Sequence, residues 1–188
     1  MNAGVINFAV YENGTEYLGL AKITLPDMTN KMLTVNGAGI PGDLDIPVPG
    51  HRDAMSVKIE FIDAPQAAYK LAEHRQHILD CRAAHEDYDA TTGTIKVTAY
   101  KHILTVLPKS LGGGTIGPVA AQAVSGEYSC VARQDYIDGV LMLDYDPANF
   151  KDVDASGTSD LPLFALRSAS NIKQKERAFC LERSLKIL

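Results

Sequence analysis

Three histidines and one cysteine lie within a short stretch, and imidazole and thiolate groups are the ligands that zinc prefers. Their spacing of i, i+3, i+7 and i+11 places them along one flank of a helix: His74, His77, Cys81 and His85. One helix rarely supplies three ligands to one ion, and the sequence has no H-E-x-x-H motif. Polar histidines flanking an amphipathic helix are the commoner reading, so no metal ligand is assigned.

Two further patterns resemble parts of catalytic or cofactor sites. Asp144 and Asp146 flank Tyr145, so both carboxylates point to one face of a strand, but carboxylates at strand ends are commonly solvated charges. Residues 37–42 spell G-x-G-x-x-G, yet Pro41 blocks the helix that a dinucleotide fingerprint must open. The sequence therefore predicts no catalytic residue, no cofactor and no enzyme.

Composition places these residues in a single globular domain. The 188 residues include 46% hydrophobic and 22% charged side chains, a balance that can bury a core. No apolar run approaches the roughly 20 residues that cross a bilayer, and no basic segment precedes an apolar one at the N-terminus, so neither a membrane span nor a secretion signal is expected. The cysteines form no CxxC pair and no disulfide framework, which favours synthesis in a reducing cytoplasm.

Charge is distributed unevenly along the chain. The net charge is −5, but residues 167–188 hold six Lys or Arg against two Glu, which leaves −9 for residues 1–166. An acidic body argues against a protein that binds nucleic acid through a broad basic face.

The first part of the chain predicts short strands and a long loop. Residues 6–11 and 17–25 flank Asn13-Gly14, the pair that type I′ hairpin turns favour. Residues 31–35 form a third strand, and the many glycines and prolines of residues 36–50 predict a loop without regular structure. Loops of this length in compact domains commonly have a function.

The remaining patterns predict longer elements. Met55, Val57, Ile59 and Phe61 alternate with polar residues and indicate a half-buried strand, and helical spacing of apolar residues indicates a principal helix. The predicted elements are a strand at 54–62, the principal helix at 66–86, strands at 94–107, 119–133 and 140–145, and a basic C-terminal helix at 171–187. Pro108 is expected to end the strand at 94–107. The order predicts an α+β fold, an antiparallel β-barrel or sandwich with one principal helix and a C-terminal helix.

A resemblance to a known family rests on motifs in both halves of the sequence. The segments are Tyr17-Leu-Gly-Leu-Ala-Lys-Ile-Thr-Leu-Pro26, Gly37-Ala-Gly39-Ile-Pro-Gly42, Asp53-Ala-Met-Ser-Val-Lys-Ile-Glu-Phe61, Tyr128-Ser-Cys130, Tyr136-Ile-Asp-Gly139, Leu141–Asp146 and Asn149-Phe150-Lys151. In this order they resemble the major tail tube protein of contractile-tailed bacteriophages over roughly residues 5–155. The basic tail is longer than that family leads one to expect, so we divide the chain into a tube domain at 1–160 and a helical extension at 161–188.

The resemblance implies a structural subunit that closes into six-fold rings, which stack into the inner tube of a contractile injection machine. Its implied partners are further copies of itself, the tail sheath protein, the baseplate hub and the tape measure protein, with DNA passing through the bore and no membrane. The implied location is the virion tail, or a bacteriocin particle, after synthesis in the host cytoplasm. Rings that stack need one contact that closes and one axial contact that stays open.

Two sets of residues are the candidates for these contacts. The loop at 36–50 is the expected axial contact between rings, through Gly39, Ile40, Leu44, Ile46 and Val48. The polar faces of the long strands are expected to face the bore, through Lys58, Glu60, Lys96 and Glu127. The acidic body further predicts a bore that repels DNA phosphates.

Three alternatives stay open at this point. The same fold could build the tube of a phage-tail-like bacteriocin or of a type VI secretion apparatus, neither of which carries a genome. A metal-binding enzyme would use the histidines and cysteine named above. A small-ligand binding barrel would remain monomeric at high concentration.

Overall fold

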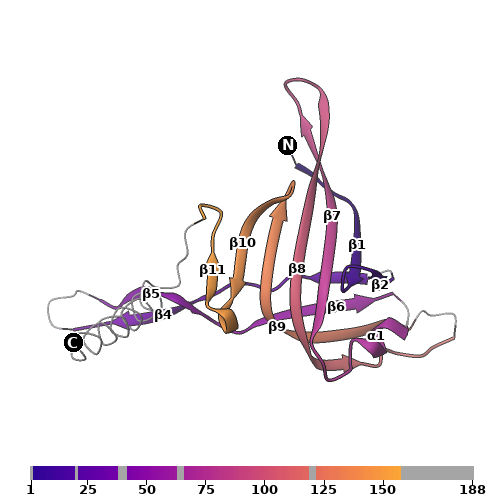
Figure 1. The fold of residues 1–188 in the computed structure, drawn as a ribbon, viewed down its shortest axis with the longest axis horizontal. Coiled ribbons are helices and arrows are strands. Elements are labelled where there is room, and N and C mark those ends of the chain that lie inside the picture. Colours follow the sequence, from indigo (N-terminus) through magenta and orange to yellow (C-terminus); the bar gives the residue numbers. More distant parts are fainter. Residues whose placement is uncertain (1, 20, 38–41, 63–65, 119–121, 158–188) are drawn as a thin grey trace, which may run out of the picture.

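The part of the protein that the structure describes is mostly antiparallel β-sheet with very little helix (Figure 1). The computed structural model describes residues 2–19, 21–37, 42–62, 66–118 and 122–157. Its elements are β1 (Asn2–Glu12), β2 (Glu16–Tyr17), β3 (Ala21–Thr24), β4 (Asn30–Val35), β5 (Leu44–Arg52), β6 (Met55–Phe61), α1 (Gln66–Lys70), β7 (His77–Asp89), β8 (Thr94–Gly112), β9 (Val124–Ile137), β10 (Val140–Asp146), the 3-10 helix η1 (Pro147–Asn149) and β11 (Lys151–Val153). The predicted helix at 171–187 lies outside the described residues.

Nine of the described strands form one sheet, and two form a separate sheet. The main path runs β11-β10-β9-β8-β7-β1-β2, and β6 joins β9 on the same side as β10 and carries β3. Among the described strands, β4 and β5 pair only with each other. The antiparallel part of the predicted fold is confirmed, whereas the described strands do not close into a barrel, because the path ends at β2 and β11.

The core is built largely from residues of β6, β7, β8 and β9. Met55, Val57, Ile59 and Phe61 of β6 are all buried, as their alternation predicts. They pack with residues of β7, β8 and β9, among them Leu79, Leu104, Val106, Val124 and Tyr128. This part of the interior follows from a strict period of two, because one face of each strand must leave water.

The principal helix predicted at 66–86 is wrong. Only Gln66–Lys70 form a helix, and His77–Asp89 form the long strand β7, which pairs with β1 on one side and with β8 on the other. His77, Leu79 and Cys81 also alternate inward at a period of two, so the apolar pattern fits either structure. Backbone pairing along both edges stabilises the strand, and local helix propensity cannot outweigh this pairing.

The turn at Asn13-Gly14 is confirmed, but the second half of the predicted hairpin changes partner. Both turn residues have positive φ angles, and Tyr11 and Glu12 pair with Tyr17 and Glu16. Beyond Gly19, which also has a positive φ of 86°, the chain enters β3 and pairs with β6 instead of β1. Glycine permits this change of direction at little steric cost.

The irregular loop predicted at 36–50 is partly wrong. From Leu44 onward the segment is strand β5, which pairs with β4 and forms a projecting two-stranded arm, here called the β4–β5 arm and defined as residues 30–35 and 44–52 (Figure 1). Proline is tolerated in β5 because an edge strand can leave N–H positions unpaired. The predicted break at Pro108 is also wrong: β8 continues to Gly112 through a register shift beside β9, beyond the last pairing with β7 at Val106.

Gly126 makes a close approach that predicts a measurable effect of substitution. A Cβ atom at this position would meet the hydroxyl of Tyr128 and lie 2.6 Å from its Cε2 atom. Because Tyr128 is buried, its ring has little room to move. We expect Gly126→Ala to lower the free energy of unfolding by about 1–3 kcal/mol through overpacking. Urea unfolding measures the change, with Gly157→Ala, where a Cβ would meet no neighbour but φ is positive, as a backbone-strain reference.

Candidate functional site

The four residues considered as metal ligands do not lie on one helical flank. His74 lies in the turn after α1, while the other three are spread along β7. Four strand residues span about 13 Å, so His77, Cys81 and His85 lie too far apart to share an ion. Among the described residues, no three His, Cys, Asp or Glu side chains gather as a metal site would require. The arrangement on which the metal hypothesis depends is therefore absent.

Cys81 is also poorly suited to bind a metal or to act as a nucleophile. Burial, with a smaller contribution from the nearby Asp80 carboxylate, raises the pKa of its thiol to about 12. The thiolate is the form that binds metals and attacks electrophiles. At neutral pH the side chain therefore remains a protonated, apolar part of the core.

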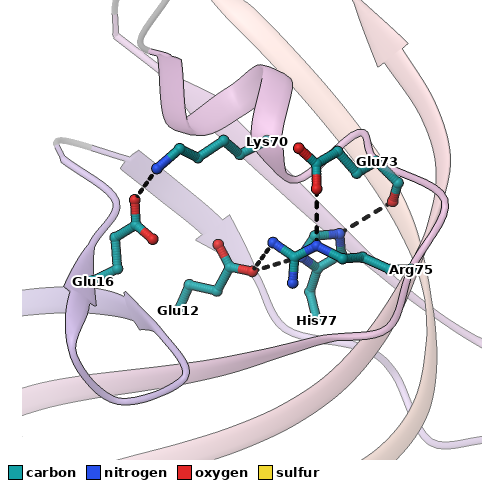
Figure 2. A network of polar contacts seen from close by, with 6 residues as sticks. All are labelled: Glu12, Glu16, Lys70, Glu73, Arg75 and His77. Carbon is teal, nitrogen blue, oxygen red and sulfur yellow. Dashed lines mark hydrogen bonds and ion pairs between the residues drawn. The ribbon is translucent and has the colours of Figure 1, made fainter.

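His77 instead forms part of a buried polar network (Figure 2). Its Nδ1 atom lies 2.7 Å from Oε1 of Glu12, and its Nε2 atom lies 3.2 Å from the carbonyl oxygen of Glu73. Arg75 donates from Nη2 to the same Glu12 oxygen at 2.8 Å. Glu12 and His77 are 1% and 0% exposed, so this is a carboxylate shared by two donors inside the protein.

The network joins segments that are distant in sequence. Glu12 ends β1, Arg75 belongs to the turn after α1, and His77 begins β7. Beside it, Lys70 of α1 pairs with Glu16 of β2 (Figure 2). The hydrogen bond from Arg75 lowers the pKa of Glu73, which holds that carboxylate in its charged form. The contacts position this end of the sheet.

Asp144 and Asp146 have structural partners. Asp144 is buried and accepts a hydrogen bond from Nε2 of Gln134 at 3.1 Å. Asp146 caps η1 by accepting from the backbone N–H of Asn149 at 3.1 Å. The two carboxylates thus stabilise the end of β10 and the following turn.

Three of the four predicted bore residues lie together on the polar face of β6 and β9. Lys58 lies directly opposite Glu127 in the strand register, and its Nζ atom is 3.3 Å from Oε1 of Glu60. Lys109 contacts Glu127 at 2.6 Å. Lys96 lies apart, on the β7–β8 hairpin, with its Nζ atom 3.9 Å from Asp138.

The charge of this polar face is mixed. Lys58 and Lys109 accompany Glu60 and Glu127, and Lys22 lies opposite Glu60 on β3. Paired opposite charges cancel at distances beyond a Debye length. The face therefore does not support the acidic bore expected from the net charge.

Three of the five predicted axial residues lie on the β4–β5 arm. Leu44 and Ile46 are exposed, and Val48 is half-buried. Gly39 and Ile40 lie outside the described residues. An exposed two-stranded sheet is only marginally stable by itself, so the arm has the character of a contact element.

The sequence analysis missed an edge strand, which the fold exposes. β1 pairs with β7 on one side, but along residues 5–9 no described strand pairs with its other side. Val5, Ile6 and Phe8 are exposed there, and residues 2–11 contain no charged side chain. Edge strands usually carry charges or prolines that prevent pairing, so an uncharged apolar edge is suited to pair with another chain. The uninterrupted run of uncharged residues at 2–11 is the sequence feature that could have predicted this edge.

A second open edge lies at the other end of the sheet path. β10 pairs with β11 only from Asp144 to Asp146, so residues 140–143 have no described strand on that side. Val140 and Leu141 are exposed. The two edges belong to different strands, so their contact would be head-to-tail between copies.

None of the helices in the described part of the chain has the length and apolarity required to cross a membrane. The chain matches the family described as phage tail tube protein FII over residues 3–155. No curated protein matches the sequence.

Two solved structures resemble the fold. The sheath/tube terminator of an extracellular contractile injection system, PVC, in its extended state has 10% sequence identity and a TM-score of 0.47, covering 70% of this chain and 93% of that one. The sheath-tube complex of the extended PVC system has 12% identity and a TM-score of 0.44, covering 70% and 86%. Structural similarity at these sequence identities and TM-scores carries no argument about function.

Proposed function

Because the chain belongs to the phage tail tube protein FII family, we propose that it polymerises as stacked six-fold rings, which form the inner tube of a contractile injection machine. Proteins of this family are structural, so the chain is a tail tube subunit and not an enzyme. It is a component of a virion or particle tail. The finer assembly, with DNA passing through the bore, is the part that we propose.

The observation that carries the proposal is the pair of open strand edges at β1 and β10. A copy that places its β1 edge against the β10 edge of a neighbour makes a head-to-tail contact, and such contacts form a ring when the rotation between copies closes. Pairing also removes the aggregation hazard of the uncharged β1 edge. The resemblance to tail tube proteins supplies the number six.

Stacking needs a second contact, for which the β4–β5 arm is the candidate. Leu44, Ile46 and Val48, with Gly39 and Ile40 of the connecting segment, would contact the next ring along the axis. Because this contact does not close on itself, it extends the rings into a tube.

The remaining faces of the subunit would form the bore and the outer surface of the tube. The polar face with Lys58, Glu60 and Glu127 would line the bore, where its paired charges offer DNA phosphates little net attraction. The tail sheath protein would surround the tube, and the baseplate hub and tape measure protein would determine where it starts and how long it grows. Residues 1–160 form the tube domain in this proposal, and 161–188 form its basic extension.

Electron microscopy of concentrated protein tests the assembly directly. Rings or tubes are the expected result, with hexameric rings sedimenting as a single species before stacking. If the protein forms only monomers, even when preformed tube ends are added as seeds, the proposal is wrong. Single-particle symmetry analysis of the rings decides between six-fold and other closures.

We expect Ile6→Lys to block lateral assembly without unfolding the subunit. Ile6 is 55% exposed on the open β1 edge, and a lysine there opposes strand pairing as it does on natural edge strands. Ile62→Lys is the matched control, because Ile62 is 59% exposed and lies outside both open edges. Sedimentation measures assembly and circular dichroism measures folding. Equal loss of assembly in the two variants would contradict a specific role for the β1 edge.

A further inference from the structure

The root of the β4–β5 arm is irregular. Among the described strands β4 and β5 pair only with each other, and the chain enters the arm through residues 25–29 and leaves it through residues 53–54. Near this root the register shifts between Asn30 and Met32, and Gly50 has a positive φ of 73°. Because irregularities of this kind bend a strand locally, backbone pairing does not by itself fix the direction in which the arm leaves the sheet.

Arg52, at the end of β5, binds the rest of the subunit at this root. Its Nη2 atom donates to Oδ1 of Asp152 in β11 at 2.7 Å, and its Cζ atom lies 4.8 Å from the centre of the Tyr145 ring in β10. Its Nη1 atom lies 3.4 Å from Sδ of Met28, which packs against the core. One planar cation therefore contacts two strands of the main sheet and the segment that enters β4.

The ion pair between Arg52 and Asp152 is largely removed from water. The two side chains are 13% and 2% exposed, and Tyr145 beneath the guanidinium group is buried. The pair joins the arm to a strand that lies 100 residues further along the chain. Removing one partner of such a pair leaves the other charge buried and uncompensated, so each side chain holds the other in place.

We propose that Arg52 is the positioning residue of the β4–β5 arm, and that its contacts with Asp152 and Tyr145 set the direction in which the arm leaves the sheet. Figure 1 shows β10 and β11 beside the arm root, so the guanidinium group fastens the arm to the strand pair that carries the second open edge. The consequence for assembly rests on the proposed function. A subunit without Arg52 would keep its lateral edges but would offer the next ring an arm without a fixed direction, which raises the cost of the axial contact.

Distances between two spin labels test the positioning of the arm directly. One nitroxide is attached at Leu44→Cys on the arm and the other at Ser56→Cys on the exposed side of β6, in a Cys180→Ser background. Cys81 and Cys130 are buried, and burial raises the pKa of both thiols, so they should react little with the label. Double electron–electron resonance on the unassembled subunit should give one narrow distance distribution.

Single substitutions on either side of the ion pair should loosen the arm. Arg52→Ala and Asp152→Asn are each expected to widen the distance distribution severalfold while the circular dichroism spectrum stays native. The effect of Asp152→Asn is informative because this residue lies outside the arm. Lys31→Ala is the matched control: it removes the other cation of the arm, which is exposed, and the distribution should stay narrow.

A double variant separates positioning from stability. Arg52→Met combined with Asp152→Leu replaces the buried ion pair by apolar side chains, a change that commonly preserves stability. We expect urea unfolding close to that of the parent but a widened distribution, because an apolar contact has no directional bonds. A distribution as narrow as that of the parent in both Arg52→Ala and the double variant would overturn the inference.

Assembly provides the second measurement. In electron micrographs Arg52→Ala should form rings that stack into few or no tubes. Tubes of this variant as long and as abundant as those of the parent would overturn the link between Arg52 and stacking. Failure of the unmodified chain to assemble would contradict the proposed function, whereas the spin-label distances in the single subunit still decide whether Arg52 positions the arm.

Discussion

Glu12→Ala is expected to lower the free energy of unfolding by about 3 kcal/mol, the upper end of the range found when a buried hydrogen-bonding group loses its partner. The substitution deletes the acceptor that His77 and Arg75 share, at 2.7 Å and 2.8 Å respectively. His77 is 0% exposed, so its Nδ1 atom lies away from bulk water and has Glu12 as its partner. Urea unfolding of the unassembled chain measures the change.

Two further substitutions locate the cause of this effect. Glu12→Gln keeps the volume and one acceptor, so its stability should lie between those of the parent and Glu12→Ala. Glu16→Ala removes an exposed partner of Lys70 in the same region. The midpoint of its urea unfolding should change little, because solvent screens the pair. If Glu12→Ala and Glu16→Ala shift the midpoint equally, burial is not the reason for the loss.

Phe61→Ala is expected to cost about 3–5 kcal/mol through lost burial and the cavity left behind. Phe61 is 1% exposed, at the end of β6, where it lies opposite Val124 of β9. The neighbouring Ile62→Ala is the matched control, because that side chain is 59% exposed. Thermal and urea unfolding of both variants provide the comparison.

The Phe61 prediction also has a consequence for assembly. Lateral contacts stabilise only the folded subunit, so assembly should raise the unfolding midpoint of Phe61→Ala by mass action. A midpoint for Phe61→Ala as high as that of Ile62→Ala in unassembled protein would show that the β6 face is not a core face.

Much of the fold was predictable where local patterns agree with long-range pairing. The alternation in β6 correctly places Met55, Val57, Ile59 and Phe61 inside, and Asn13-Gly14 correctly marks a hairpin turn. In both cases a few neighbouring residues carry the whole signal. The family assignment was predictable for a related reason, since it depends on the order of motifs along the chain and not on their contacts.

Residues 77–86 show where prediction from local sequence patterns fails. Their apolar side chains fit a helical stripe and also alternate inward as a strand, and β1 and β8 decide between the two by pairing with both edges. The strand β1 is distant in sequence, and His77 pairs with Val106 at the far end of the β7–β8 hairpin, so no short window around His77 contains the deciding information. The metal hypothesis failed with the helix, because it required a shared helical flank.

The candidate site was predictable in part. Lys58, Glu60 and Glu127 gather on one face because β6 and β9 alternate regularly, but Lys96 follows β8 onto the projecting hairpin. The segment with Leu44 and Ile46 was expected to be a loop, because its prolines and glycines are typical of irregular structure. It is an edge strand, where those residues are tolerated. The open edge of β1 was missed because exposure of an edge depends on which strands are absent beside it.

The amino-acid order alone settled the alternating β character, the position of the first turn and the family, since each depends on residues close together or on their sequence along the chain. The fold settled which strands neighbour one another, and with that the burial of His77 against Glu12 and the open edges. Such features arise from pairing between segments far apart in the chain. They become defined only when the hydrophobic surfaces of those segments are buried together.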